Sequence, residues 1–291
     1  MDANHGGNAM LSEKSLLSFV SDLLLQNAWS LSHAERITRI ARTYDRWAGP
    51  QVRLGDLDEN RLNQWLRELE AGRSATTVLS YRRHLLLIWF AAAREGLSPP
   101  NVYRIRKPRS LPTRPVAWLL DDVQSLLSAA ERTTGTIGEI DESLFWPAII
   151  RVAYDTGLRL GDVLSLQLDQ ISTNPTWIVQ HKTRQSKIIS VHQSTLEAVQ
   201  ATVPPDRHLA FPLPFLRRQF YLRFRALVQL AGLSGTFKRL RCTSGSYVER
   251  DNPGLGSQHL GHKTPGIFTK HYEDVSITKT RLLLPPEIVL S

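Results

Sequence analysis

The stretch ATTVLSYRRHLLLIWFAAARE, residues 75–95, decides the architecture of the first part of this chain. Its apolar side chains recur at Leu79, Leu85 and Ile88, which is the spacing of a helix with one buried face. The apolar run at residues 85–93 is much shorter than the roughly 20 residues that a membrane-spanning helix needs. The stretch therefore predicts a long helix packed against other helices, and no membrane span.

Three shorter segments before this helix carry the same kind of pattern. They are residues 12–26, 32–47 and 58–69. Apolar side chains three or four positions apart predict a helix in each of them, and Ser12 is a suitable N-cap for the first. Four such helices in succession predict an all-α domain over residues 12–105, after a loose tail at residues 1–11.

The sequence after the long helix is basic and rich in proline. Residues 99–115 contain five prolines and no apolar periodicity, so we expect an extended linker at residues 106–117. Glu95 is the only acidic residue between positions 73 and 114, and clustered Lys and Arg side chains neutralise DNA phosphates and release counterions. We predict that this region contacts DNA, with a solvated basic surface as the alternative. The predicted DNA-contacting residues here are Arg73, Arg82, Arg83, Arg104, Arg106, Lys107 and Arg109.

The composition of the whole chain narrows its partners. Its 291 residues include 36 Lys and Arg against 27 Asp and Glu, a net charge of +9, which favours a polyanionic partner such as nucleic acid or an anionic lipid surface. A basic enzyme without such a partner is the alternative. Cys242 is the only cysteine, which excludes an intramolecular disulfide framework and a cysteine-based zinc site. The first ten residues lack a signal-peptide pattern, so we expect a cytoplasmic protein.

Regular helical patterns resume at Trp118 and predict a second domain over residues 118–274. Amphipathic helices are expected at residues 119–132, 144–154, 160–168, 194–203, 213–230 and 239–250. The β-rich runs TWIVQ (176–180) and SKIISV (186–191) flank HKTRQ, which indicates a β-hairpin. The predicted fold class is therefore mainly α with a small antiparallel β-sheet, an α+β chain in two domains.

Two cations of the second domain stand at positions that favour anion binding. Arg159 follows Gly157, which ends one helix just before the next begins. Asp162 can hold the Arg159 guanidinium in a bidentate pair, so that the remaining donors point toward an anion. An ordinary surface ion pair gives the same pattern. Lys182 lies at the predicted hairpin tip, where a plain turn lysine is the alternative.

The other candidates lie in the last quarter of the chain. Lys238 and Arg241 are three positions apart and share one face of a predicted helix. The stretch HLGHKTPGIFTKHYED, residues 259–274, places three histidines and two lysines around Tyr272. Taken alone, this stretch is compatible with a metal site, a DNA-contacting loop or plain surface. His262 and Tyr272 are its candidate functional residues.

Five short motifs occur in this chain in a fixed order. They are TGLRLGDVLSL (156–166), HKTRQSK (181–187), KRLRCTS (238–244), HLGHKT (259–264) and HYED (271–274). Together they resemble the arginine, lysine, His/Lys-x-x-Arg, histidine and tyrosine motifs of the tyrosine recombinase (phage integrase) family. The resemblance is to Xer-like or mobile-element integrases and covers roughly residues 12–280. It implies an N-terminal four-helix, SAM-like core-binding domain and a C-terminal tyrosine recombinase catalytic domain.

The resemblance implies a site-specific recombinase or integrase that cleaves and rejoins DNA through a 3′-phosphotyrosine and a free 5′-hydroxyl. Tyr272 would be the nucleophile, and Arg159 and Arg241 the phosphate clamp. Lys182 would be the general acid for the leaving oxygen. No metal and no cofactor is implied, because the phosphotyrosine conserves the bond energy. The remaining implied residues are His262 and Lys238 at the phosphate, Asp162 as support for Arg159, and Arg239 and Lys263 as further DNA contacts.

The resemblance also implies partners and a location. The substrate would be double-stranded DNA with inverted-repeat core sites, bound by a homotetramer that is a monomer or dimer when free. We expect the reaction in the cytoplasm of a bacterium or archaeon, in association with the nucleoid, with no membrane partner. The apolar tail at residues 275–291 would dock on a neighbouring subunit or on its own domain. Two other functions stay open: relaxation of supercoils by a type IB topoisomerase, and DNA binding by a catalytically inactive relative.

The motifs depart from the family pattern at two points. Position 238 is lysine where histidine is more common, and an ammonium cannot accept a proton, so a phosphate contact is expected there. His262 and Tyr272 are ten positions apart, one more than is usual, and Pro265–Gly266 predicts a loop that absorbs the extra residue. His271 is the alternative if the register shifts. The remaining tyrosines on apolar helical stripes are expected to pack: Tyr154, Tyr221 and Tyr247.

Overall fold

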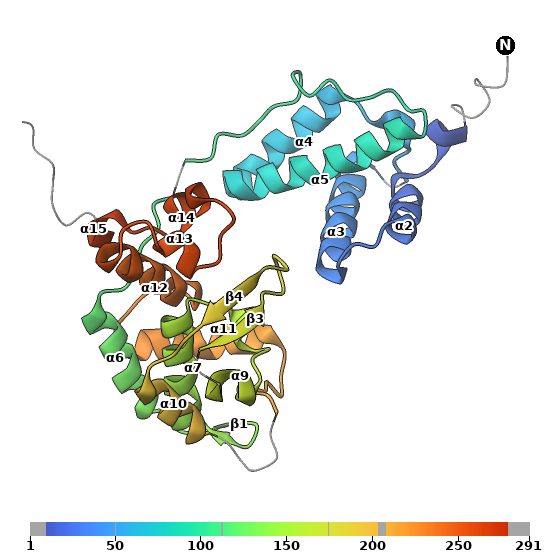
Figure 1. The fold of residues 1–291 in the computed structure, drawn as a ribbon. Coiled ribbons are helices and arrows are strands. Elements are labelled where there is room, and N and C mark those ends of the chain that lie inside the picture. The colour runs from blue at the N-terminus through green and yellow to red at the C-terminus, as the bar shows by residue number, and fades with distance from the viewer. Residues whose placement is uncertain (1–9, 50, 112, 174, 203–207, 279–291) are drawn as a thin grey trace, which may run out of the picture. The chain divides into compact units, whose positions relative to one another are not determined.

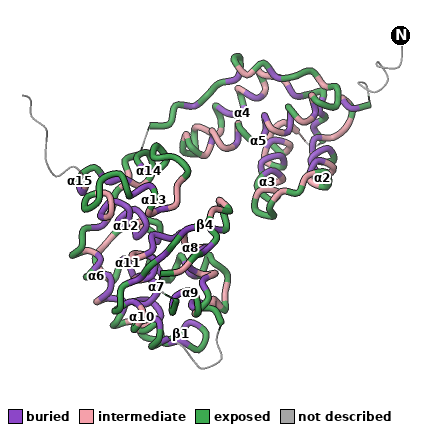
Figure 2. The backbone as a smooth tube through the Cα atoms, viewed as in Figure 1, coloured by how far each residue is buried: buried purple, intermediate pink, exposed green. Residues whose placement is uncertain are grey.

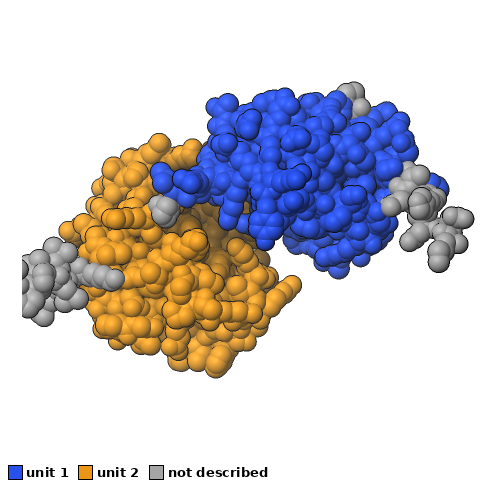
Figure 3. Space-filling view, turned by 90° about the horizontal axis from the view of Figure 1, so that it is seen from above, with its two compact units in different colours: residues 1–112 blue, residues 113–291 orange. Residues whose placement is uncertain are grey.

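The computed structural model describes residues 10–49, 51–111, 113–173, 175–202 and 208–278. The chain divides into two compact units, residues 1–112 and 113–291, which Figure 3 shows in different colours. The boundary lies inside the stretch 106–117 that the sequence indicates as a linker. Each unit has its own buried apolar core. None of the helices in the described ranges is both long and apolar enough to cross a membrane.

The first unit is built from helices, as predicted (Figure 1). They are α2 (Leu16–Gln26), α3 (Leu31–Ala48), α4 (Glu59–Gly72) and α5 (Ala75–Arg94), with a short 3-10 turn at Leu54–Asp56. The start of α2 differs from the prediction because Ser15, and not Ser12, is its N-cap. The Ser15 hydroxyl accepts the amide of Ser18 at 3.2 Å, which meets one of the free amides of the first turn.

Aromatic rings fill the centre of this unit. Tyr44 of α3 meets Trp65 of α4 edge-on, with ring centroids 5.0 Å apart, and Trp65 lies 5.7 Å from the ring of Tyr81 in α5. Buried residues follow one face of each helix (Figure 2). Because α5 contacts α2, α3 and α4, it is the long packed helix that its sequence predicts.

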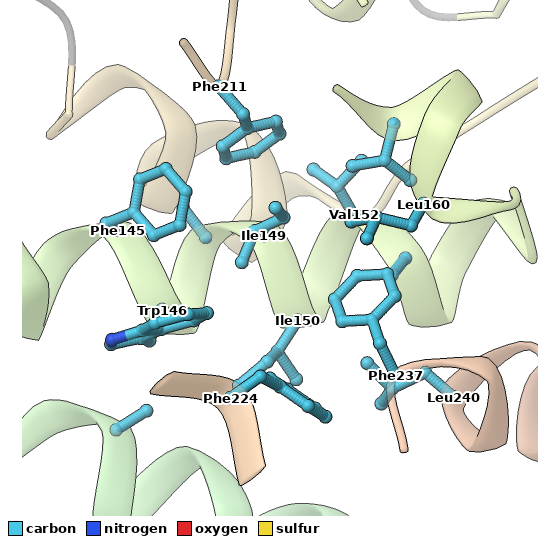
Figure 4. Packing of buried hydrophobic residues seen from close by; sticks show 14 of the residues in the cluster. Phe145, Trp146, Ile149, Ile150, Val152, Leu160, Phe211, Phe224, Phe237 and Leu240 are labelled. Carbon is cyan, nitrogen blue, oxygen red and sulfur yellow. The ribbon is translucent and has the colours of Figure 1, made fainter. Parts of the chain in front are cut away.

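The second unit is arranged around α7 (Glu142–Thr156). This helix contacts α6 (Leu120–Glu131), α10 (Gln193–Gln200) and α12 (Lys238–Asp251). Figure 4 shows Phe145, Trp146 and Ile149 of α7 in the same cluster as Phe211, Phe224 and Phe237; Phe224 lies on α11 (Arg217–Leu230). The end of α7 is therefore fixed in position by packing on several sides.

A glycine turns the chain sharply at the end of α7. Gly157 has φ +58°, and a Cβ atom there would lie 2.6 Å from Cδ2 of Leu260. Only glycine combines the left-handed backbone with the missing side chain. The turn leads directly to Arg159, the residue before α8 (Leu160–Val163).

The predicted hairpin is present as two antiparallel strands. These are β3 (Thr176–Val179) and β4 (Ser186–Ile189), paired from Thr176 with Ile189 to Val179 with Ser186. A second pair, β1 (Thr136–Ile137) and β2 (Ile140–Asp141), was not predicted. Two residues per strand are too few to produce a recognisable alternation in the sequence.

Short helices follow α12 and carry the last motifs. They are α13 (Gly256–His259), α14 (Pro265–His271) and α15 (Val275–Thr278), and α9 (Leu168–Ser172) follows α8 earlier in the unit. The loop predicted from Pro265–Gly266 is wrong. Pro265 is the first residue of α14, where its fixed φ suits a helix and its missing amide proton is not needed.

Candidate active site

Arg241 is the most firmly held cation of the second unit. Only 2% of its surface is exposed. Its Nη1 donates to the carbonyl of Gly157, and its Nη2 donates to the carbonyl of Leu260 at 2.7 Å. Burial first, and repulsion by Arg159 second, lower the pKa of Arg241 to about 10, so the guanidinium keeps its charge at neutral pH. Its Nε donor is buried and has no hydrogen-bond partner among the described residues.

Arg159 is held more loosely than Arg241. It is half-buried, and its Nη1 donates to Oε1 of Gln180 at 3.2 Å. The expected bidentate pair with Asp162 is not formed. Asp162 is buried and instead accepts the amide of His181 at 2.8 Å, because its side chain faces the start of the turn between β3 and β4. Asp162 therefore supports the segment that carries Lys182, and Gln180 supports Arg159.

Tyr272 follows α14 and lies beside these cations. Lys238 Nζ is 4.8 Å from the centre of the phenol ring, and Arg241 Cζ is 5.0 Å from it. The ring of His262 is 4.8 Å from the same ring, centroid to centroid. The tyrosine thus stands next to Arg241 of its own chain, one of the two arginines of the predicted clamp.

His262 is held in its neutral form. Its Nε2 lies 2.9 Å from Nη2 of Arg241, and a guanidinium can only donate, so Nε2 is the acceptor and the proton sits on Nδ1. Burial, followed by repulsion from Arg241 and Arg159, lowers the pKa of His262 to about 4. The buried Nδ1 has no partner among the described residues. His262 therefore has one free donor, whereas the alternative residue His271 is exposed.

A single pocket of about 580 Å³ joins most of the predicted site. Its lining includes Arg159, Lys182, Lys238, Arg241 and Tyr272. Lys182 and Lys238 are both exposed, in contrast to Arg241. Five of the six residues that the motifs imply as catalytic therefore face one space, and His262 is bonded to one of them.

Sequence analysis missed a buried lysine behind this pocket. Lys187 is 7% exposed, and its Nζ donates to the carbonyl of Thr156. Burial, with Arg241 and Arg159 acting in the same direction against Asp162, lowers the pKa of Lys187 to about 7. Its place in β4, with an inward position in the alternation of the strand, is the signal that could have identified it.

Three residues of α11 also line the pocket, Tyr221, Phe224 and Arg225, and Tyr221 corrects a prediction. Tyr221 was expected to pack in the core, but it is 49% exposed and faces the pocket together with Arg225. The other two tyrosines differ: Tyr247 is buried and Tyr154 is half-buried. Tyr221 and Arg225 are four residues apart, so they share one face of the helix.

His259 does not belong to the pocket. Its Nε2 lies 2.7 Å from Oγ of Ser244, and burial, followed by repulsion from Lys187, lowers the pKa of His259 to about 3. Nowhere in the described ranges do three or more His, Cys, Asp or Glu side chains cluster in a way that could hold a metal ion.

The basic residues predicted to contact DNA differ in how free they are. Arg82 is half-buried and donates to the carbonyls of Val102 and Ile105, so it holds the segment after α5. Arg106 pairs with Glu70 at 2.7 Å. Arg239 is half-buried and donates to the carbonyl of Ser234. The remaining ones are exposed: Arg73, Arg83, Arg104, Lys107, Arg109 and Lys263.

A second basic face lies on α3 and was missed. Its exposed arginines are Arg36, Arg39, Arg42 and Arg46. At about 100° per residue these four fall within roughly one third of the helix circumference. The three- and four-residue spacing of these arginines is a sequence signal that could have identified the face.

The comparisons with known proteins agree with this geometry. Residues 119–278, more than half of the chain, match the phage integrase family. A putative tyrosine recombinase XerC from Pseudomonas aeruginosa is 30% identical over 134 residues, which is 41% of this chain and 30% of that protein. The chain thus spans less than a third of the length of this relative.

Solved structures share the fold of almost the whole chain. A lambda integrase (75–356) dimer bound to a COC′ core site matches with a TM-score of 0.72 at 19% identity, over 94% of this chain and 98% of that one. A lambda integrase tetramer bound to a Holliday junction also gives 0.72, at 18% identity, over 97% of this chain and 83% of that one. The fold class predicted from the sequence is confirmed. The chain belongs to the phage integrase, or tyrosine recombinase, family.

Proposed function

We propose that this protein is a site-specific tyrosine recombinase that cleaves and rejoins DNA strands through a 3′-phosphotyrosine. One observation carries the proposal: Tyr272, Arg159 and Arg241 line the same pocket although they lie far apart in the sequence. A tyrosine nucleophile beside two guanidinium groups is the arrangement that phosphoryl transfer to a protein side chain requires.

The two arginines would bind the scissile phosphate from different elements. Arg241 has a buried Nε donor without a partner among the described residues and stands near the N-terminus of α12, where helix amides also favour an anion. Arg159 stands at the N-terminus of α8. Guanidinium donors that are fixed before the reaction stabilise the charge that builds up on the phosphate oxygens. The Nδ1 donor of neutral His262 would add a further hydrogen bond.

Proton transfer would involve the exposed lysines. In the cleavage step the Tyr272 oxygen bonds to phosphorus, the bond from phosphorus to the 5′-oxygen breaks, and that oxygen needs a proton. Lys182 lies on the turn between β3 and β4 at the pocket and would act as the general acid. The phenolic proton would pass to solvent water, and Lys238, close to the phenol ring, would favour this loss by placing positive charge beside the oxygen.

The substrate would be duplex DNA with inverted-repeat core sites. The net charge of +9, the exposed basic residues around α5 and the arginine face of α3 favour such a polyanion. The related lambda integrase has been solved as a dimer on a core site and as a tetramer on a Holliday junction, which supports a tetramer on DNA for this chain too. Because it would act on chromosomal or mobile-element DNA, the protein would be cytoplasmic and associated with the nucleoid.

The experiment uses a suicide substrate. A binding site is first recovered from a pool of random duplexes by repeated binding to the protein, and is then nicked beside the cleavage point so that the released fragment cannot rejoin. The wild-type chain should form an adduct stable to denaturation. Tyr272→Phe should bind with a Kd within about twofold of wild type, because a single neutral hydroxyl contributes little to affinity for a polyanion, and should form no adduct. Tyr154→Phe, outside the pocket, should behave as wild type.

Other outcomes would support other functions. An equal adduct from Tyr272→Phe would refute the assignment of the nucleophile. DNA binding without any adduct from the wild-type chain would favour an inactive DNA-binding relative. Relaxation of a supercoiled plasmid that lacks the recovered site would favour a type IB topoisomerase.

A further inference from the structure

The backbone of Tyr272 is held by two side chains of α12. The Cys242 thiol donates to the Tyr272 carbonyl at 2.9 Å, and the Ser246 hydroxyl donates to the same oxygen at 3.2 Å. Cys242 and Ser246 are one helical turn apart, so they project from one side of α12. Both are buried. Two donors from successive turns of α12 thus bind the same carbonyl oxygen.

This carbonyl needs side-chain partners because it stands at the end of a helix. The last carbonyls of a helix have no amide from a following turn. The amides of Tyr272 and Glu273 both donate back to Phe268, and the amide of Ser276 donates to Oδ1 of Asp274. Within the described ranges, the two α12 side chains are therefore the partners that the Tyr272 carbonyl has.

The same helix carries two of the cations of the site, Lys238 and Arg241. Lys238 precedes Cys242 by one turn, and Arg241 is its neighbour in sequence. Nζ of Lys238 and Cζ of Arg241 lie 4.8 Å and 5.0 Å from the phenol ring. One helix therefore carries Lys238 and Arg241 and also holds the backbone from which the nucleophile projects.

A third contact extends this arrangement past the nucleophile. The amide of Asp274 donates to Oγ of Ser246 at 2.9 Å, and Oδ2 of Asp274 accepts the amide of Ala117 at 2.7 Å. Ser246 thus both donates to the residue that attacks and accepts from the residue two positions later. The turn from α14 into α15 is fixed on each side of Tyr272.

We propose that Cys242 and Ser246 are positioning residues for Tyr272, whose hydrogen bonds hold the phenol oxygen at the distance from the clamped phosphate that attack requires. This role rests on the proposed function. Neither side chain touches the reacting atoms in this arrangement. Burial raises the pKa of the Cys242 thiol to about 12, so the thiol keeps its proton and stays a donor throughout the neutral range.

The test measures single-turnover adduct formation at saturating DNA, on the nicked duplex described above. Misplacing a reacting group by about 1 Å can cost about 100-fold in rate. We expect Ser246→Ala to slow cleavage about 10-fold and the double variant Cys242→Ala with Ser246→Ala about 100-fold. The Kd for DNA should stay within about twofold of wild type, because no phosphate contact is removed.

Two further variants separate positioning from a general loss of structure. Cys242→Ser keeps a donor, so its cleavage rate should exceed that of Cys242→Ala and lie within about threefold of wild type. Thr243→Val removes a buried hydroxyl of the same helix that bonds to the amide of Trp118 and not to Tyr272. It should lower the melting temperature as much as Ser246→Ala does, yet leave the cleavage rate within about twofold of wild type.

The outcomes are distinct. If the wild-type chain forms no adduct, the proposed function fails and this role fails with it. If the wild-type chain forms the adduct and the double variant cleaves at the same rate, the proposed function stands and the positioning role is overturned. An equal loss of rate in Thr243→Val would also overturn it, because the effect would then be one of stability alone.

Discussion

Arg241 and Lys182 line the same pocket but are held in opposite ways. Arg241 is 2% exposed and bonded to Gly157, Leu260 and His262. Lys182 is exposed on a turn, and no hydrogen bond or ion pair of its side chain occurs within the described residues. Under the proposed function this contrast is a division of roles: the fold would hold the phosphate ligand Arg241 in place before DNA binds, whereas the proton donor Lys182 would reach its final position only with DNA bound.

The largest expected effect comes from Arg241→Lys. A lysine cannot reproduce the fork of donors, so a carbonyl of Gly157 or Leu260 loses its partner and the phosphate loses a ligand. We expect cleavage to fall about 1,000-fold and the free energy of unfolding to fall by about 2 kcal/mol. Suicide-substrate kinetics and urea unfolding measure the two quantities. A loss in rate below about tenfold would contradict the fixed clamp.

Lys182→Met should separate activity from stability. An exposed turn residue contributes little to folding, so the free energy of unfolding should change by less than about 0.5 kcal/mol, while cleavage falls about 100-fold or more. A substrate with sulfur in place of the bridging 5′-oxygen should restore the rate, because a thiolate leaves without a proton. If that substrate is cleaved as slowly as normal DNA by the variant, Lys182 is not the general acid.

The pH dependence of the free energy of unfolding tests the state of Lys187. Like Arg241 it is a buried basic residue, but it loses its charge more easily. Its pKa of about 7 in the folded protein lies below the value of about 10.4 in an unfolded chain. Between these values the unfolded chain holds a proton that the folded chain does not, so raising the pH stabilises the fold. From pH 7 to pH 9 the free energy of unfolding should rise by about 2 kcal/mol more in wild type than in Lys187→Met. Parallel curves from denaturant titrations would contradict the depressed pKa.

The smallest effects are expected for Arg82 and Arg83 of the first unit. These two residues are neighbours in sequence, but Arg82 is held by hydrogen bonds and Arg83 is exposed, as Arg241 and Lys182 are in the second unit. Arg83 is exposed, and Arg83→Ala should weaken DNA binding a few-fold and reduce the salt dependence by about one counterion. Arg82 bonds to carbonyls, and Arg82→Ala should instead lower the free energy of unfolding by about 1 kcal/mol. DNA binding at several salt concentrations and urea unfolding measure the two effects. A loss of stability in Arg83→Ala together with a loss of binding in Arg82→Ala would contradict the assignment.

Strong local patterns made most of the fold predictable. The helix α5 was predictable because its stretch is long and periodic. The strands β3 and β4 were predictable because their two runs are rich in β-forming residues. The strands β1 and β2 and the helices α13 to α15 are too short for a period to show. Pro265 was misread because a proline fits a loop and the first turn of a helix equally well.

The residue types and the order of the motifs predicted the members of the site but not their contacts. The motifs indicated Arg159, Arg241 and Tyr272, which the fold brings to one pocket. They did not indicate that Asp162 would bond to His181, nor that Lys187 would be buried, because both depend on how the hairpin packs on the end of α7. The bond between Asp162 and His181 leaves no local trace in a single sequence, and the burial of Lys187 leaves one only as an inward position in the alternation of β4.

The central claim is that Tyr272 attacks a phosphate held by the arginines of its own chain. Mixing two inactive proteins, Tyr272→Phe and Arg241→Lys, on the suicide substrate tests it directly. If the nucleophile and the clamp act within one chain, no mixed dimer contains a complete site, and the mixture should form no more adduct than the separate variants. An adduct that appears only in the mixture, at a substantial fraction of the wild-type yield, would contradict the claim, since Tyr272 would then serve a neighbouring subunit.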